Sequence, residues 1–192
     1  MISFELFGYP VNIMVGLDDY DENFKQTNQN WNVGCTAFAA FSVLWVIQLI
    51  AFTFYHSVGA VNGKGSIFGP WRNRVLFGRH TMDTVAMLGF SYMGYEALVN
   101  FGGFAAVPEL IQNGAIMGVG GERAYVFSAA TQRLCVMQIA YEAKNFCDSV
   151  IHNDGVVFLI HHTVTGLLAA LSCRPFLHLY CAYFLGWSEI ST

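Results

Sequence analysis

Charged residues are scarce in this sequence of 192 residues. They make up 11% of the chain, whereas soluble domains average about 25%. Hydrophobic residues reach 55%, and the stretch between Lys25 and Lys64 contains no Asp, Glu, Lys or Arg. This composition excludes an ordinary soluble surface and indicates a protein embedded in a membrane, because a span needs about 20 predominantly apolar residues.

Several signatures of other functions are also missing. No basic patch with interleaved aromatic residues is present, so we expect no nucleic-acid partner. The chain has no G-x-S-x-G motif, no P-loop and no G-x-G-x-x-G before a helix. Its five cysteines form no C-x-x-C pair and are typical of small buried hydrophobes. Although Asp148 and His152 have the spacing of one helix face, none of the six histidines lies in an H-x-x-H-H box, and we expect no metal.

The chain contains long apolar segments that are separated by glycine-rich or charged turns. They predict an all-α integral membrane protein, a multi-span helical bundle of about five to six membrane segments. The predicted spans are 33–56, 84–101, 124–147, 155–172 and 175–190, with 101–121 as a broken helix or re-entrant turn. An acidic arm, 1–32, precedes the bundle, 33–192. Because the last segment is still apolar at Thr192, we expect the natural chain to continue beyond it.

Ionisable residues inside the predicted spans are costly, from about 2.5 kcal/mol upward at the membrane centre, and usually face a bundle interior or a wet cavity. The candidates are Glu96, Arg133, Glu142, Asp148, His161, His162 and Glu189. We expect Glu96, Arg133 and Asp148 to face the bundle interior or a partner protein, and not lipid. Glu96 and Arg133 have opposite charges on neighbouring spans, so they are predicted to pair.

The stretch "LIHHTVTG" places two histidines side by side in a segment with no charged residue. Adjacent helical residues point about 100° apart, so His161 and His162 cannot share one face fully. His162 shares its face with Gly166, which leaves room for a ligand or a neighbouring backbone. Two interpretations stay open: the rings pack at a helix–helix seam through a hydrogen bond, or at least one of them lines a polar cavity.

Three motifs, in order, make the chain resemble the TLC-domain family, which includes the translocating-chain-associating membrane protein and the ceramide synthases. "WRNRVLFGRH" supplies Trp71, Arg74 and His80. "YEAKNFCDSVIHNDGVVFLIHHTVTG" supplies Tyr141, Asp148, Asp154, His161 and His162, and "WSEIST" supplies Glu189, Ser191 and Thr192. The resemblance covers about residues 70–192 and is closer to the small members that are not ceramide synthases. The family pattern would add one to three spans after Thr192.

The resemblance implies a protein of the endoplasmic reticulum that binds or regulates lipids through a polar cavity inside the bundle. The implied lipid-binding residues are His161, His162, Asp148, Glu189, Trp71, Arg74 and His80. Asp148 and Glu189 would hold the imidazole tautomer. The expected ligand is a membrane lipid. If the protein were an enzyme, the catalytic candidates would be His161, His162 and Asp148.

Two other functions stay open. The chain could be a non-catalytic accessory subunit of a respiratory or photosynthetic complex, in a mitochondrial inner or thylakoid membrane, with other membrane subunits as partners and a pigment as the alternative ligand. An acyl-CoA-dependent N-acyltransferase is disfavoured: ceramide synthases carry a second motif with His and Asp, and here that place reads "FLGWSEIST". We therefore expect a protein without chemistry of its own.

Overall fold

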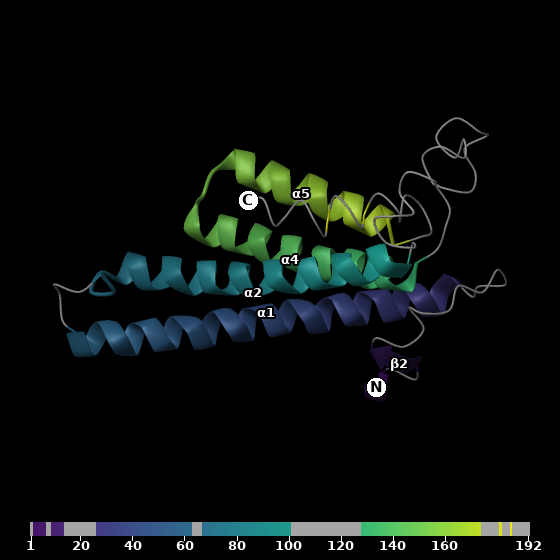
Figure 1. Ribbon diagram of the computed structural model, residues 1–192, viewed down its shortest axis with the longest axis horizontal. Helices are drawn as coiled ribbons and strands as arrows, with labels where there is room; N and C mark the ends of the chain where they lie inside the picture. Colours follow the sequence, from purple (N-terminus) through teal and green to yellow (C-terminus); the bar gives the residue numbers. More distant parts are fainter. Residues whose placement is uncertain are drawn as a thin grey trace.

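The computed structural model of the protein describes residues 2–6, 9–13, 26–62, 67–100, 128–173, 181 and 185. Within these ranges the chain forms a two-stranded antiparallel hairpin followed by helices (Figure 1). The elements are β1 (Ile2–Leu6), β2 (Tyr9–Ile13), α1 (Gln26–Asn62), α2 (Trp71–Asn100), α4 (Ala129–His152) and α5 (Val156–Leu171). The hairpin register places Ile2 opposite Ile13 and Leu6 opposite Tyr9.

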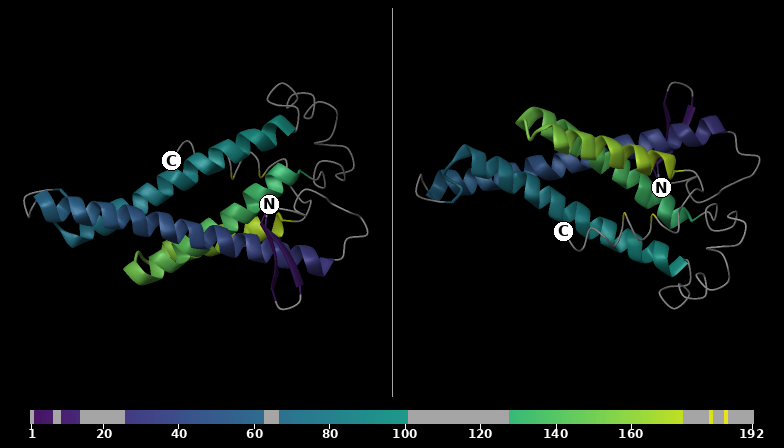
Figure 2. Two further views of the ribbon diagram at one scale, coloured as in Figure 1. Left: turned by 90° about the horizontal axis from the view of Figure 1, so that it is seen from below. Right: turned by 90° about the horizontal axis from the view of Figure 1, so that it is seen from above.

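The helices form one bundle. α1 and α2 are antiparallel neighbours, α4 packs against both of them, and α5 folds back over α4 as an outer layer (Figure 1). α1 and α2 lie close together near the turn that joins them and spread apart toward their other ends, where α4 enters between them (Figure 2). The β hairpin lies beside the N-terminal part of α1. The predicted helical bundle is therefore confirmed for the described residues.

Two helices extend beyond the predicted spans. α1 begins at Gln26, inside the predicted arm, and α2 begins at Trp71 instead of residue 84. The segment before residue 84 is rich in arginine and glycine, which is typical of a loop. Pro70 precedes the helix, where a missing N–H is tolerated, and its carbonyl already accepts the N–H of Arg74 at 3.4 Å. Arg74 and Arg79 therefore project from a helix.

The turn between α4 and α5 lies where the sequence predicted a break. Asn153 ends α4 in the left-handed region with φ of 55°, and its N–H donates to the carbonyl of Ser149. Gly155 follows with φ of 108°, a conformation that favours glycine. At the other end of α4, the Ser128 hydroxyl accepts the N–H of Thr131 at 3.2 Å. The predicted broken helix or re-entrant turn, 101–121, lies outside the described residues, as does most of the predicted span 175–190.

The bundle interior combines an apolar core with buried polar groups, and many of its outward-facing side chains are apolar. Lys144 and Asp148 on α4 are fully buried, as are Gln132 and Thr131. Large apolar side chains face outward instead; they include Phe38, Leu49, Ile50 and Phe54 on α1, Leu88 and Tyr92 on α2, and Val157, Ile160, Val164 and Leu167 on α5. Soluble proteins seldom bury Lys and Asp, and large exposed apolar patches mark membrane or protein contacts.

Among the described helices, only α1 is both long and apolar enough to cross a membrane, over Asn32–Asn62 with a mean hydropathy of 2.1. α5 is apolar but has 16 residues. α2 and α4 carry the ionisable side chains of the interior, which lower their hydropathy. The structure thus supports membrane association through one helix, and the predicted number of spans stays a prediction.

Small residues allow the helices to approach closely around an apolar centre. The buried cluster there contains Ala40, Leu44, Met82, Ala86, Phe90, Leu134, Ala140 and Tyr141. The rings of Phe90 and Tyr141 meet edge to face with centroids 5.3 Å apart. This cluster fixes α2 against α4, which positions the polar groups described next.

Candidate functional site

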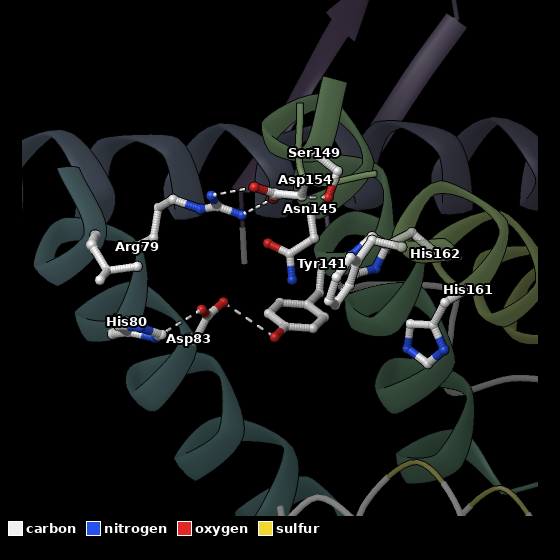
Figure 3. Close-up of a pocket in the computed structure, with 11 residues that line it drawn as sticks. Arg79, His80, Asp83, Tyr141, Asn145, Ser149, Asp154, His161 and His162 are labelled. Carbon is white, nitrogen blue, oxygen red and sulfur yellow. Dashed lines mark hydrogen bonds and ion pairs between the residues drawn. The ribbon is translucent and has the colours of Figure 1, made fainter. Parts of the chain in front are cut away.

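A cavity of about 440 Å³ opens between α2, α4 and α5 (Figure 3). Its lining is mostly polar and ionisable: Leu76, Arg79, His80, Asp83, Tyr141, Asn145, Ser149, Asp154, Phe158, His161 and His162. A cavity of this volume can hold a small molecule or the headgroup of a larger one, such as a lipid. The cavity is therefore the candidate functional site.

Arg79 and Asp154 form one edge of the cavity. The Arg79 guanidinium donates to both carboxylate oxygens of Asp154, at 2.6 Å from Nη2 and 3.3 Å from Nη1. The Ser149 hydroxyl also donates to this carboxylate, at 3.3 Å. The hydrogen bond from Arg79 holds the pKa of Asp154 below its usual range, because it favours the charged carboxylate. This contact ties the start of α2 to the α4–α5 turn.

Asp83 and Tyr141 lie on the opposite side of the cavity. The Tyr141 hydroxyl donates to Oδ1 of Asp83 at 3.2 Å. Nδ1 of His80, one turn earlier on α2, lies 4.0 Å from Oδ2 of the same carboxylate. Figure 3 shows these three side chains converging on one corner of the cavity. This corner offers both hydrogen-bond donors and acceptors to a bound group.

His161 and His162 form the α5 wall. Nδ1 of His162 lies 2.7 Å from Oε2 of Glu142, a buried residue of α4, and the two imidazole centroids are 5.3 Å apart. The Gln138 amide donates to the other Glu142 oxygen at 2.7 Å. Gly166 makes this approach fit, since a Cβ there would lie 3.3 Å from Cβ of Glu142. The room expected beside His162 is therefore taken by the neighbouring helix.

A second polar cluster lies on the other side of α4. The Lys144 ammonium donates to Oδ2 of Asp148 at 2.6 Å and to Oε1 of Gln48. Gln48 in turn donates to Oδ1 of Asp148 at 3.3 Å, and Nε of Arg79 lies 3.4 Å from this carboxylate. The cluster joins α1, α2 and α4 through groups that are satisfied by one another, as buried charges require.

The structure brings together only part of the residue set expected from the sequence. His80, His161 and His162 line the cavity. Asp148 does not: it is fully buried and contacts Lys144, Gln48 and Arg79 instead of a histidine. Glu189 lies outside the described residues.

Trp71 and Arg74 also lie away from the cavity lining. Trp71 is 62% exposed and packs edge to face on Phe52 with centroids 5.0 Å apart. Arg74 closes the α1–α2 turn: it donates to the carbonyls of Phe68 and Gly69, both at 2.6 Å, and lies 2.9 Å from His56. Both residues have structural roles at the turn.

Asp83, which lines the cavity, was not among the site residues expected from the sequence. One signal was available: Asp83 follows His80 by three residues and therefore shares its helix face. Two other expectations are confirmed. Nη2 of Arg133 lies 2.8 Å from Oε1 of Glu96, and Asp148 faces the interior.

No family model matches the chain, and no curated protein or solved structure is significantly similar to it. The resemblance to the TLC-domain family therefore stays a prediction from the motifs.

Proposed function

We propose that this chain is a multi-pass membrane protein of the TLC-domain type that binds a lipid, with the headgroup in the cavity between α2, α4 and α5. The observation that carries the proposal is a cavity with ionisable lining residues inside a bundle whose outer surface carries many apolar side chains. Ionisable groups line the interior and the cavity, while Leu88 on α2 and Val164 on α5 face outward. A lipid matches both environments, since it joins a polar head to apolar chains.

The lining also favours a class of headgroup. Asp83 and Asp154 both present carboxylates to the cavity, and the Arg79 guanidinium is already bound to Asp154. These carboxylates would repel a strongly anionic headgroup. Among the described lining residues, only a protonated histidine would offer it a cation that is not already paired. A headgroup with hydroxyl or amide groups fits better, because it can donate to Asp83 or to the Tyr141 oxygen and accept from an imidazole.

A cavity-filling substitution tests the proposal without disturbing the buried ion pairs. Leu76 lines the cavity, so Leu76→Trp should fill it. Leu88 lies on the same helix, is 67% exposed and is not part of the lining, so Leu88→Trp is the matched control. The full chain would be purified into nanodiscs made from native membrane, and the retained lipid measured by mass spectrometry.

We expect one lipid class to be enriched over the surrounding bilayer in the wild type and in Leu88→Trp. It should fall about tenfold in Leu76→Trp, the effect of losing about 1.4 kcal/mol of binding free energy. Equal lipid content in all three proteins would contradict the proposal. Purification of the chain only with stoichiometric partner subunits, and no enriched lipid, would favour the accessory-subunit alternative.

A further inference from the structure

Three metal-donor side chains converge at the α5 wall of the cavity. One ligand atom from each of Glu142, His161 and His162 lies within 4.8 Å of the other two. Glu142 comes from α4 and the two histidines from α5, so the fold, and not local sequence, brings the set together. Figure 3 shows the two imidazoles side by side at the cavity.

We propose that Glu142, His161 and His162 bind one zinc ion. Two imidazoles and one carboxylate are a donor set that zinc uses where three protein ligands leave a fourth position open. The proposal stands on these side chains alone and does not depend on whether the cavity binds lipid.

The distances fit a metal with small side-chain movements. At zinc–nitrogen and zinc–oxygen distances of about 2.0–2.1 Å, neighbouring tetrahedral donors are about 3.3 Å apart. Glu142 Oε2 and His162 Nδ1 are 2.7 Å apart, joined by a hydrogen bond. An ion would replace that hydrogen and separate the two atoms by about 0.6 Å. His161 is exposed, so its ring is free to turn toward the ion.

The surroundings of Glu142 also suit a ligand. The side chain is 4% exposed, and buried carboxylates are usually paired or bound to metal. Gln138 donates to Oε1 at 2.7 Å, which orients the carboxylate and leaves Oε2 on the side of the histidines. Such supporting hydrogen bonds are typical of metal sites. Gly166 keeps α5 close enough for both helices to reach one ion.

The fourth position would face the cavity. His161 and His162 line the cavity, whereas Glu142 lies behind them and is not part of its lining. An ion held between these groups would therefore be reached from the cavity, where water completes its coordination. This placement distinguishes the proposed site from a closed structural zinc site, in which four protein ligands exclude solvent.

Metal content tests the proposal directly. The full chain would be purified in detergent by a tag that binds no metal, treated with chelator and titrated with ZnCl₂. Zinc per chain would be measured by mass spectrometry, and Co²⁺ would be used as a probe of tetrahedral coordination by visible absorption. His161→Ala is the main variant, because the ring is exposed and the chain should fold without it. Glu142→Gln keeps the acceptor for Gln138. His152→Ala, an exposed histidine at the end of α4, is the control.

We expect one zinc per chain in the wild type and in His152→Ala. Zinc affinity should fall at least about 100-fold in His161→Ala and Glu142→Gln, with loss of the Co²⁺ absorption. Gln138→Leu, which removes only the supporting hydrogen bond, should lower the affinity about 10- to 100-fold. Wild-type protein that binds no zinc, or His161→Ala that binds it as tightly as wild type, would overturn the proposal; Glu142 and His162 would then form a hydrogen-bonded pair only.

The same preparations keep this proposal separate from lipid binding. Retained lipid would be measured beside zinc in each variant. Enriched lipid without zinc would reject the metal site and leave the proposed function standing. Bound zinc without enriched lipid would support the metal site and contradict the proposed lipid binding.

Discussion

Arg79 and Asp154 join the start of α2 to the turn between α4 and α5, with Nη2 of the arginine 2.6 Å from Oδ2 of the aspartate. The two residues are 75 positions apart in the chain. The contact fixes the edge of the cavity, because both side chains are part of its lining. It also makes the stability of the bundle sensitive to pH.

Asp154→Asn should destabilise the protein by about 1 kcal/mol at neutral pH, as expected for a partly exposed ion pair. Arg79 lowers the pKa of Asp154 in the folded state. The stabilisation is therefore fully present above the ordinary pKa of an aspartate, about 3.9, and is lost as the pH falls through the lowered value. Melting temperatures of wild type and Asp154→Asn should differ at pH 7 and converge below about pH 4. The same difference in melting temperature at pH 7 and at low pH would contradict the ion pair between Arg79 and Asp154.

Lys144→Met should be among the most damaging single substitutions. It leaves the buried Asp148 carboxylate with Gln48 and Arg79 alone, and breaking a buried pair from one side costs about 3–5 kcal/mol. Lys144→Met/Asp148→Leu removes both charges, and we expect it to recover much of that loss. Arg72→Met, at an exposed position of α2, is the control. Thermal unfolding in detergent measures all three, and a double variant less stable than the single one would refute the pairing.

Two glycines should respond in opposite ways. At Gly166 a Cβ would lie 3.3 Å from Cβ of Glu142, so Gly166→Val should push α5 away from α4 and cost about 1–3 kcal/mol. At Gly89, inside α2, a Cβ would meet nothing within 4 Å. Gly89→Ala should therefore be neutral or stabilise the helix by up to about 1 kcal/mol. Equal melting temperatures for Gly166→Val and wild type would mean that the α4–α5 contact is looser than described.

The membrane proposal predicts an unusual response at a surface position. Val164 is 50% exposed on α5. In a soluble protein, Asp would be tolerated there. In a membrane-spanning helix it would cost about 2.5–3.5 kcal/mol of insertion free energy. Val164→Asp should therefore lower the fraction of chain that resists alkaline extraction from membranes, whereas His152→Asp at the exposed end of α4 should not. Unchanged extraction of Val164→Asp would count against α5 as a span.

The sequence predicts which segments are helical and which charged residues are interior better than it predicts which side chains contact one another. Apolar runs locate α1 and α5, and opposite charges on neighbouring helices predict the contact of Arg133 with Glu96. Asp148 was the wrong histidine partner among the described residues: Glu142 contacts His162 instead, because the choice depends on the rotation of α4. Glu142 and Asp148 are six residues apart, about 240° around a helix, so one faces α5 and the other faces α1 and α2. Which of the two meets the histidine is decided by packing.

The start of α2 was missed for a related reason. Arginine and glycine suggest a loop, whereas Arg74 lies in the helix and donates to the carbonyls of Phe68 and Gly69 in the turn before it. The corner of Asp83 and Tyr141 likewise joins residues 58 positions apart, which no local pattern connects. The helices can therefore be predicted from the sequence, whereas the site depends on how they pack against one another.

The turn closed by Arg74 has a consequence for the order in which the protein is built. Its contacts with His56, Phe68 and Gly69 all lie within one short stretch of chain, so α1 and α2 can pair during synthesis before α4 exists. At that moment Gln48 and Arg79 still lack their partners on α4 and in the turn that follows it. The helical hairpin would then form first, and its polar groups would be completed when α4 and the turn after it pack against it.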